Sequence, residues 1–361
     1  MKEEFEINFQ VKDAEPSKFE TIRNSYYEIW EEIEQNFSCF TMNYGKKKIG
    51  FDFNWEPIKK YYKENIENMP KNQKEFIKAV RKFDRMSEEE SEEYILQQRE
   101  KRKIKVKCIV ELKSSDKSEF DDKPKQALRN HLSHHLEFYL ENLFLLANIS
   151  APGSCNLKFK YKTGEYLGKP SERKNSFIVY DLYSAWERIL SKELPEIKRI
   201  PLMKTWRWFK KLEINTRQVA KTNVERALFA LLHFCHNEDL ISSNSIIWLA
   251  HALESLYDTP RTSIRKSLKD RILMVLNIKS HKNKVKKGVN NFYDLRSRLV
   301  HGDFNITHPC MNDIFDNKVE EVGIKMGDNI EFILIIIIAT LQRLILEEWN
   351  EIKFVEDYYG K

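Results

Sequence analysis

The chain has 361 residues, which is enough for two domains that each bury a core of their own. With 41% hydrophobic and 32% charged residues but only 10 Gly and 10 Pro, the composition is typical of a soluble globular protein and argues against long disordered linkers. Five scattered cysteines without a Cys-x-x-Cys pair argue against a disulfide framework or a zinc ribbon, and the N-terminus has no apolar signal-peptide core, so we expect a reduced, cytoplasmic protein.

The net charge of +6 is concentrated in one part of the chain. Between Arg261 and Arg298, twelve Lys and Arg residues stand against two acids, so the remainder of the chain is slightly acidic. A local excess of this size attracts polyanions, and nucleic acid is the most common of these in a cell.

The first 200 residues show strand and helix patterns together. Apolar residues that alternate with polar ones predict strands, and apolar residues with a period of 3.6 predict helices. The predicted strands are residues 4–11 and 103–112, and the predicted helices are 17–37, 87–103 and 130–149, the last ended by Pro152-Gly153. We therefore expect an α+β domain over residues 1–200, with sensing or target selection as its inferred role.

From residue 201 onward only helical patterns continue. Five helices are predicted, at residues 222–236, 245–257, 263–278, 289–301 and 328–349. The first begins with Thr222 and has Glu225 three residues later, the spacing of a capping box. The apolar run 332–339 is shorter than the roughly 20 residues that span a bilayer, so it predicts a fully buried helix rather than a membrane anchor. The fold class expected is mainly α, with a helical bundle over residues 201–361 after the α+β domain.

A motif stands at the end of the fourth predicted helix. Residues 293–302 read Tyr-Asp-Leu-Arg-Ser-Arg-Leu-Val-His-Gly. An Arg followed after four residues by a His, late in a helical bundle, resembles the signature of HEPN ribonucleases, and the surrounding residues are similar to the Apea-like subgroup of prokaryotic anti-phage proteins. The stretch 247–257, which contains Glu254, is similar to the acidic helix that precedes the motif in that family. The resemblance covers roughly residues 201–361.

The resemblance implies a metal-independent endoribonuclease with Arg296 and His301 as catalytic residues. A histidine with a pKa near ~6.5 can exchange protons with the ribose 2′-hydroxyl or the leaving 5′-oxygen, and an arginine can stabilise the charge that develops on the phosphorus. The expected product ends in a 2′,3′-cyclic phosphate, and no cofactor is expected. The family further implies a homodimer with a composite site, an RNA partner such as tRNA, and a role as a toxin or abortive-infection effector under a phage-derived or host regulator.

Four neighbouring residues are candidates for supporting roles: Tyr293, Asp294, Ser297 and Glu254. Tyr293 and Asp294 are placed to fix Arg296, although a core tyrosine and a solvent-facing acid explain them equally well. Ser297 is placed to orient His301 or to bond back to its own helix. Glu254 would hold Arg296 or another internal base, or would lie exposed without a role.

In a regular helix, Arg296 and His301 do not lie on the same face. Five residues turn a regular helix by about 500°, which places Arg296 and His301 about 140° apart. We expect Gly302 to loosen the last turn.

Six basic residues are candidates for RNA binding. These are Arg298 and the lysines of an expected loop before the motif helix, Lys279, Lys282, Lys284, Lys286 and Lys287. Such residues attract a phosphate backbone without reading its sequence, and a solvated surface is the alternative interpretation.

Three other candidate sites have weaker support from the sequence. Glu111 and Lys113 form half of a restriction-type magnesium motif, which would need Asp52 or Asp84 as a partner. His131, His134 and His135 share a helix but lack the His-Glu-x-x-His order, which favours packing over zinc binding. Trp206, Trp208 and Phe209 could stack bases, although a buried position at a domain border is favoured. A catalytically inactive bundle that dimerises or holds RNA remains the main alternative to the nuclease.

Overall fold

The structure of the protein is a computed structural model. It describes residues 2–12, 20–44, 47–68, 86–87, 90, 100, 102–113, 125–166, 169–190, 195–214, 217–236, 243–260, 262–308 and 316–354. The chain divides into two compact units. The first contains residues 1–147 and 154–178, and the second contains residues 148–153 and 179–361.

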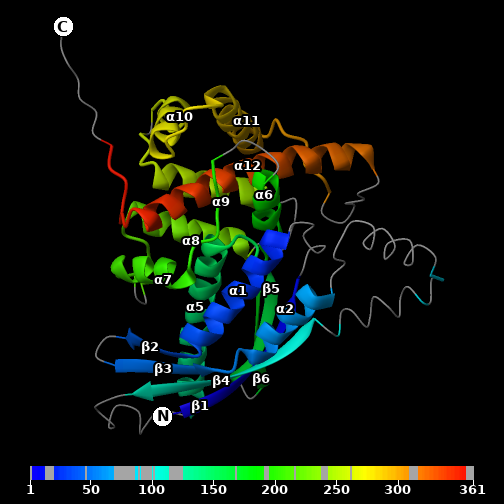
Figure 1. The fold of residues 1–361 in the computed structure, drawn as a ribbon, viewed down its shortest axis with the longest axis vertical. Helices are drawn as coiled ribbons and strands as arrows, with labels where there is room; N and C mark the ends of the chain where they lie inside the picture. Colours follow the sequence, from blue (N-terminus) through cyan, green and yellow to red (C-terminus); the bar gives the residue numbers. More distant parts are fainter. Residues whose placement is uncertain are drawn as a thin grey trace. The chain divides into compact units, whose positions relative to one another are not determined.

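The first unit is built on one antiparallel sheet of six strands in the order β2-β3-β4-β1-β5-β6 (Figure 1). The strands are β1 (Lys2–Val11), β2 (Cys39–Tyr44), β3 (Lys47–Phe53), β4 (Lys103–Lys113), β5 (Leu157–Tyr166) and β6 (Lys169–Phe177). The helices are α1 (Glu20–Phe37), α2 (Glu56–Asn68) and α5 (Lys125–Ser150), whose last three residues belong to the second unit.

The period-two pattern of the strands explains why this sheet has one covered face. In the central strand β1, Phe5, Ile7, Phe9 and Val11 are buried, and the ring of Phe9 contacts Trp55, just before α2, and Phe144 of α5. The alternate residues form the opposite face, where charged side chains pair across strands, as Glu6 does with Lys105. The core of the first unit therefore lies between this sheet and its helices.

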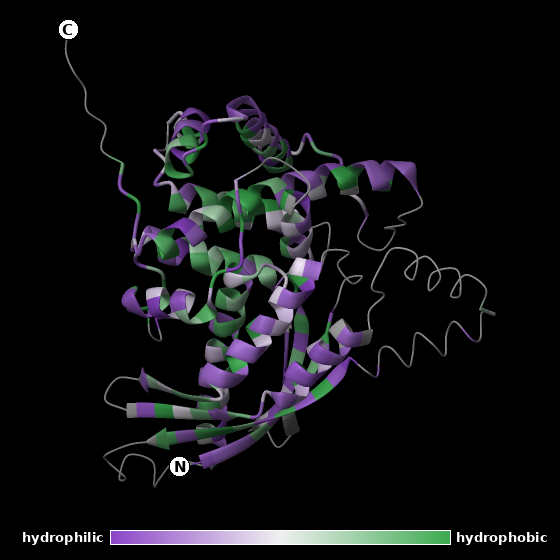
Figure 2. Cartoon of the chain, viewed as in Figure 1, coloured by the Kyte–Doolittle hydropathy of each residue, from purple (hydrophilic) through white to green (hydrophobic). Residues whose placement is uncertain are grey.

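The second unit consists of helices within the residues described. They are α6 (Tyr180–Leu190), α7 (Leu202–Lys211), α8 (Asn223–Cys235), α9 (Ser243–Leu256), α10 (Ile264–Val275), α11 (Lys282–His301) and α12 (Asn317–Leu346). Helix α12 is long and apolar enough to cross a membrane by length and composition, yet 78% of its most apolar window is buried. Residues 332–339 are all buried, and the strong green of this helix in Figure 2 marks the same apolar run. The predicted buried helix is confirmed.

The coarse fold prediction is also confirmed: the chain is mainly α, with an α+β part. The predicted strands at 4–11 and 103–112 correspond to β1 and β4, and the helices predicted at 17–37 and 130–149 correspond to α1 and α5. Thr222 caps α8 by accepting a hydrogen bond from the Glu225 backbone N–H at 3.2 Å, as the capping-box spacing predicts. Most of the helix predicted at 87–103 lies outside the described residues.

Three boundaries differ from the prediction. The second unit begins at residue 179 rather than 201, because α6 packs against α12 and Arg188 pairs there with Asp328 and Glu331. Helix α11 begins at Lys282, so the lysines expected in a loop stand on its first turns; the buried Val285 extends the apolar stripe of that helix. Helix α12 begins at Asn317 rather than 328, where Asp316 caps it through the backbone N–H groups of Lys318 and Val319.

Candidate active site at the end of the motif helix

The motif helix α11 is held in place by its buried face. Val289, Phe292 and Leu295 are buried on this face, as is Tyr293. The Tyr293 hydroxyl donates a hydrogen bond to Glu254 Oε1 of α9 at 3.0 Å. Burial and the neighbouring Glu254 carboxylate raise the pKa of Tyr293, so the phenol remains a proton donor. This bond fixes α11 against α9 one turn before the catalytic candidates.

Arg296 is half-buried on α11, close to Tyr293. The positive charge of Arg296 acts on Tyr293 by lowering its pKa, against the larger effects of burial and Glu254. The Nε atom of Arg296 is buried and has no hydrogen-bond partner among the residues that the structure describes. Buried polar groups are nearly always satisfied, but the Nε atom of Arg343 in the same unit is unmet in the same way, so this feature alone does not assign a ligand to Arg296.

His301 is the last residue of α11 and is exposed to solvent. Gly302 follows in the left-handed conformation with φ +79°, and its backbone N–H donates to the Arg298 carbonyl. Helix α11 therefore stays regular through His301, and the loosened last turn that we expected does not occur. In this helix Arg296 and His301 lie about 140° apart, so within one copy of the chain they face different surroundings.

The supporting residues make other contacts than predicted. Asp294 is exposed and pairs with Arg265 of α10 at 2.5 Å rather than with Arg296. Glu254 accepts the bond from Tyr293. Ser297 is half-buried beside Arg296 in the sequence. The exposed Arg298 donates to the Asp303 carbonyl at 3.1 Å, and its guanidinium lies over the Phe304 ring.

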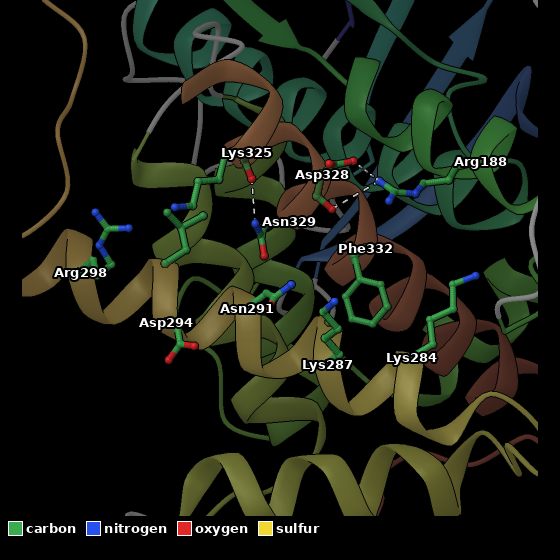
Figure 3. A pocket seen from close by; sticks show the side chains of 12 residues that line it. Arg188, Lys284, Lys287, Asn291, Asp294, Arg298, Lys325, Asp328, Asn329 and Phe332 are labelled. Carbon is green, nitrogen blue, oxygen red and sulfur yellow. Dashed lines mark hydrogen bonds and ion pairs between the residues drawn. The ribbon is translucent and has the colours of Figure 1, made fainter. Parts of the chain in front are cut away.

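A groove of about 680 Å³ lies between α11 and α12 (Figure 3). Of the six predicted RNA-binding residues, Lys284, Lys287 and Arg298 line it, whereas Lys279, Lys282 and Lys286 do not. The groove also contains residues that sequence reasoning missed: Arg188, Asn291, Lys325, Asp328, Asn329 and Phe332. Of those on α12, only Lys325 precedes residue 328, where the helix was predicted to begin.

The restriction-type metal site gains no support. Glu111 is half-buried on β4, and Asp52 of β3 accepts a hydrogen bond from the Cys39 thiol at 3.6 Å. Asp84 and the side chain of Lys113 lie outside the described residues. Within the described part of the chain, no three His, Cys, Asp or Glu residues come together as a metal site.

Two other candidate groups contain buried residues. In the histidine cluster His135 is buried, His131 is half-buried and His134 is exposed. Burial, with smaller effects from His131 and His134, lowers the pKa of His135 to about 4, so this imidazole is neutral inside the first unit. Trp206, Trp208 and Phe209 are buried in the second unit, and the Trp208 indole donates to the Trp349 carbonyl at 2.7 Å. These aromatic rings do not form an exposed surface for stacking bases.

No family model matches the chain, and comparisons with curated proteins and with solved structures give no match either. The HEPN resemblance therefore depends on the residues of the motif and on their surroundings in the second unit.

Proposed function

We propose that the second unit is a metal-independent endoribonuclease of the HEPN type, with Arg296 and His301 as its catalytic residues. One observation carries the proposal. A single helix holds an exposed imidazole at its end and, five residues earlier, a half-buried guanidinium. The bond between Tyr293 and Glu254 holds that helix in position.

The chemistry follows from these two groups. His301 accepts the proton of a ribose 2′-hydroxyl, and the 2′-oxygen attacks the adjacent phosphorus as the bond to the 5′-oxygen breaks. A second imidazole donates a proton to the leaving 5′-oxygen. Arg296 stabilises the negative charge on the phosphorane through the planar donors of its guanidinium. The products are a 2′,3′-cyclic phosphate and a 5′-hydroxyl, so protons and charge balance without a metal.

The second imidazole would come from a second copy of the chain. Because Arg296 and His301 lie on different faces of α11, a site that uses both groups on one phosphate needs a partner whose own motif helix faces the first. Apolar side chains near His301 support such a contact: Val300 is 55% exposed and Ile306 is 74% exposed. A partner that faces the motif would cover these two side chains and remove their apolar surface from water.

We further propose an effector role in anti-phage defence, in which the first unit selects the target RNA. Transfer RNA is one candidate target. This role rests on the resemblance of residues 201–361 alone. A map of cleavage sites on cellular RNA, made with and without infection, tests it: sites that are confined to infected cells are expected, and identical maps contradict it.

The activity is tested on total RNA with purified protein in EDTA. We expect fragments that end in 2′,3′-cyclic phosphate, and we expect His301→Ala to slow their formation by about 100-fold or more, the usual contribution of a general acid or base. The matched control is His251→Ala, which removes an exposed histidine of α9 and should leave the rate unchanged.

Three outcomes contradict the proposal in different ways. Cleavage that stops in EDTA indicates a metal-dependent enzyme and favours the alternative in which Glu111 binds the metal. Cleavage that survives His301→Ala places the catalytic base elsewhere. Tight RNA binding without any cleavage indicates an inactive RNA-holding module, an alternative favoured by the separation of Arg296 and His301 within one copy.

A further inference from the structure

The groove between α11 and α12 carries positive charge that its own acids do not neutralise. Arg188 is paired with Asp328 at 2.7 Å and with Glu331 at 2.9 Å. Asp294, the other acid of the groove, is paired with Arg265 outside it. The remaining four cations have no acidic partner in the part of the chain that the structure describes; they are Lys284, Lys287, Arg298 and Lys325.

The walls and floor of the groove differ in chemistry. Figure 3 shows Lys284, Lys287, Asn291 and Arg298 along α11, opposite Lys325 and Asn329 of α12. Asn329 donates its amide N–H to the Lys325 carbonyl. The floor is apolar because the Phe332 ring lies directly against Gly288, where any Cβ would collide with it. Phe332 is itself buried, so the ligand contacts that the groove offers are the cations on the rim and the amides between them, which suit the phosphates of a ligand.

We propose that this groove holds one strand of RNA by its phosphates and leads it to His301. This proposal rests on the proposed function only for the statement that the bound strand is cleaved at His301. Lys284 and Arg298 are separated by fourteen residues, about 21 Å along the helix, so the row of cations can follow several consecutive phosphates. Arg298 stands three residues before His301, and residues at this spacing are neighbours on a helix surface. A strand bound along the row therefore reaches the catalytic histidine.

Charge decides between RNA and a protein occupant. A second copy docked groove against groove would bring the same uncompensated cations together, and like charges at that distance repel. A nucleic-acid strand brings one negative charge per nucleotide and releases its counterions on binding, which is favourable at ordinary salt. The volume of about 680 Å³ lies within the roughly 300–1,000 Å³ of small-ligand sites, so the groove itself takes up only a short segment of a strand.

The test separates the groove from the remaining positive charge of the same region. In a His301→Ala background, which should bind without cutting, one variant carries Lys284→Gln, Lys287→Gln and Lys325→Gln. Its matched control carries Lys279→Gln, Lys282→Gln and Lys286→Gln, the same change of charge at predicted residues that do not line the groove. Binding is measured by fluorescence anisotropy with single-stranded oligouridine of increasing length, at several salt concentrations.

We expect the groove variant to lose about tenfold or more in affinity for a 20-nucleotide strand, and the control to lose less than about threefold. Three lost phosphate contacts should also reduce the slope of log affinity against log salt by roughly 2, because each contributes about 0.7 for a single strand. Affinity should increase with length up to several nucleotides. Circular dichroism of both variants checks that the exposed lysines have not changed the fold.

Equal losses in the two variants overturn the proposal, because they show attraction by net charge alone. It is also overturned if uridine monophosphate binds as tightly as the oligomer, which indicates a small-ligand site. A groove variant that binds RNA normally but changes its oligomeric state in sedimentation indicates a protein interface. Cleavage by the wild-type protein is measured separately. If the protein cleaves RNA but the groove variant binds RNA normally, the groove proposal is wrong and the nuclease proposal is retained. If the protein does not cleave RNA but the groove variant loses RNA binding, the nuclease proposal is wrong and the groove proposal is retained.

Discussion

Arg296 keeps a buried Nε that finds no partner among the described residues, and this is costly in a folded protein. An unmet buried donor costs about 1–3 kcal/mol. Helix α8 of the same unit shows the usual solution: the buried Glu225 carboxylate accepts from Arg217 and from the Lys221 backbone N–H. The Nε atom of Arg343 in this unit is unmet as well, so the unmet donor accompanies the motif but does not by itself assign a ligand to it.

The Asp181 carboxyl makes the stability of the folded protein depend on pH. Burial, with a smaller effect from the Glu331 carboxylate, raises the pKa of Asp181 from its usual 3.8 to about 7. A carboxyl whose folded pKa is raised favours the folded state at low pH, and this contribution is lost as the pH rises from about 4 through 7. Arg188, which pairs with Glu331, does not offset the effect. We expect Asp181→Asn to raise the melting temperature, little at pH 4 and increasingly up to pH 7, above which the gain is constant.

The measurement is a set of thermal melts by circular dichroism from pH 4 to 9. Asp270→Asn, which removes an exposed carboxylate of α10, is the control and should show a small, even effect across that range. A gain from Asp181→Asn that does not change with pH would show that the carboxyl is not titrating in this window.

The sequence points to candidate site residues but not to their contacts. Arg296 and His301 are recognised from the spacing and context of ten residues. Asp294 was considered a support for Arg296, yet it pairs with Arg265, twenty-nine positions away in the sequence. Only the packing of α10 against α11 decides which cation an exposed acid meets, and no local pattern carries that information.

At the scale of elements, Gly288 controls how closely α11 and α12 approach. A Cβ at this position would collide with the Phe332 ring, so Gly288→Ala must push the ring or the helix aside. We expect a loss of about 1–3 kcal/mol in the free energy of unfolding, the usual cost of overpacking, measured by urea denaturation. Adding Phe332→Leu should recover part of it.

Gly327 of α12 is the matched control, because a Cβ there meets nothing within 4 Å. Gly327→Ala should stabilise the protein by up to about 1 kcal/mol through helix propensity alone. If the two glycine variants behave alike, the close contact at Gly288 does not limit the packing of these helices.

The elements that the sequence predicted are the ones with a strong apolar period. β1 and β4, in the interior of the sheet, alternate cleanly because one face is buried and the other is solvated. The edge strand β6 reads Lys-Pro-Ser-Glu-Arg-Lys-Asn-Ser-Phe and was not predicted, since its pairing with β5 depends on backbone bonds that leave no apolar pattern. The first turns of α11 were mistaken for a loop because lysines dominate them.

For the whole molecule, the second unit depends on six residues that the chain supplies before residue 154. The Ser150 carbonyl accepts from the Ile200 backbone N–H, the Ile149 carbonyl accepts from the Gln342 amide, and the Ser150 hydroxyl bonds to Thr205. We expect a fragment of residues 179–361 to be less stable than one of residues 148–361 by about 3 kcal/mol, at about 1 kcal/mol for each of three hydrogen bonds. Urea denaturation of both fragments checks this, and equal midpoints would show that the six residues are dispensable.

The same interleaving limits how the gene can be rearranged. A recombination crossover between residues 178 and 179 would join the second unit to the first unit of another protein, and residues 148–153 would then come from that other protein. Those residues must still offer two carbonyls and a hydroxyl at the right places inside another core. Swapping one half of this protein by simple recombination therefore disrupts the other half, so the two should be inherited and should diverge as a pair.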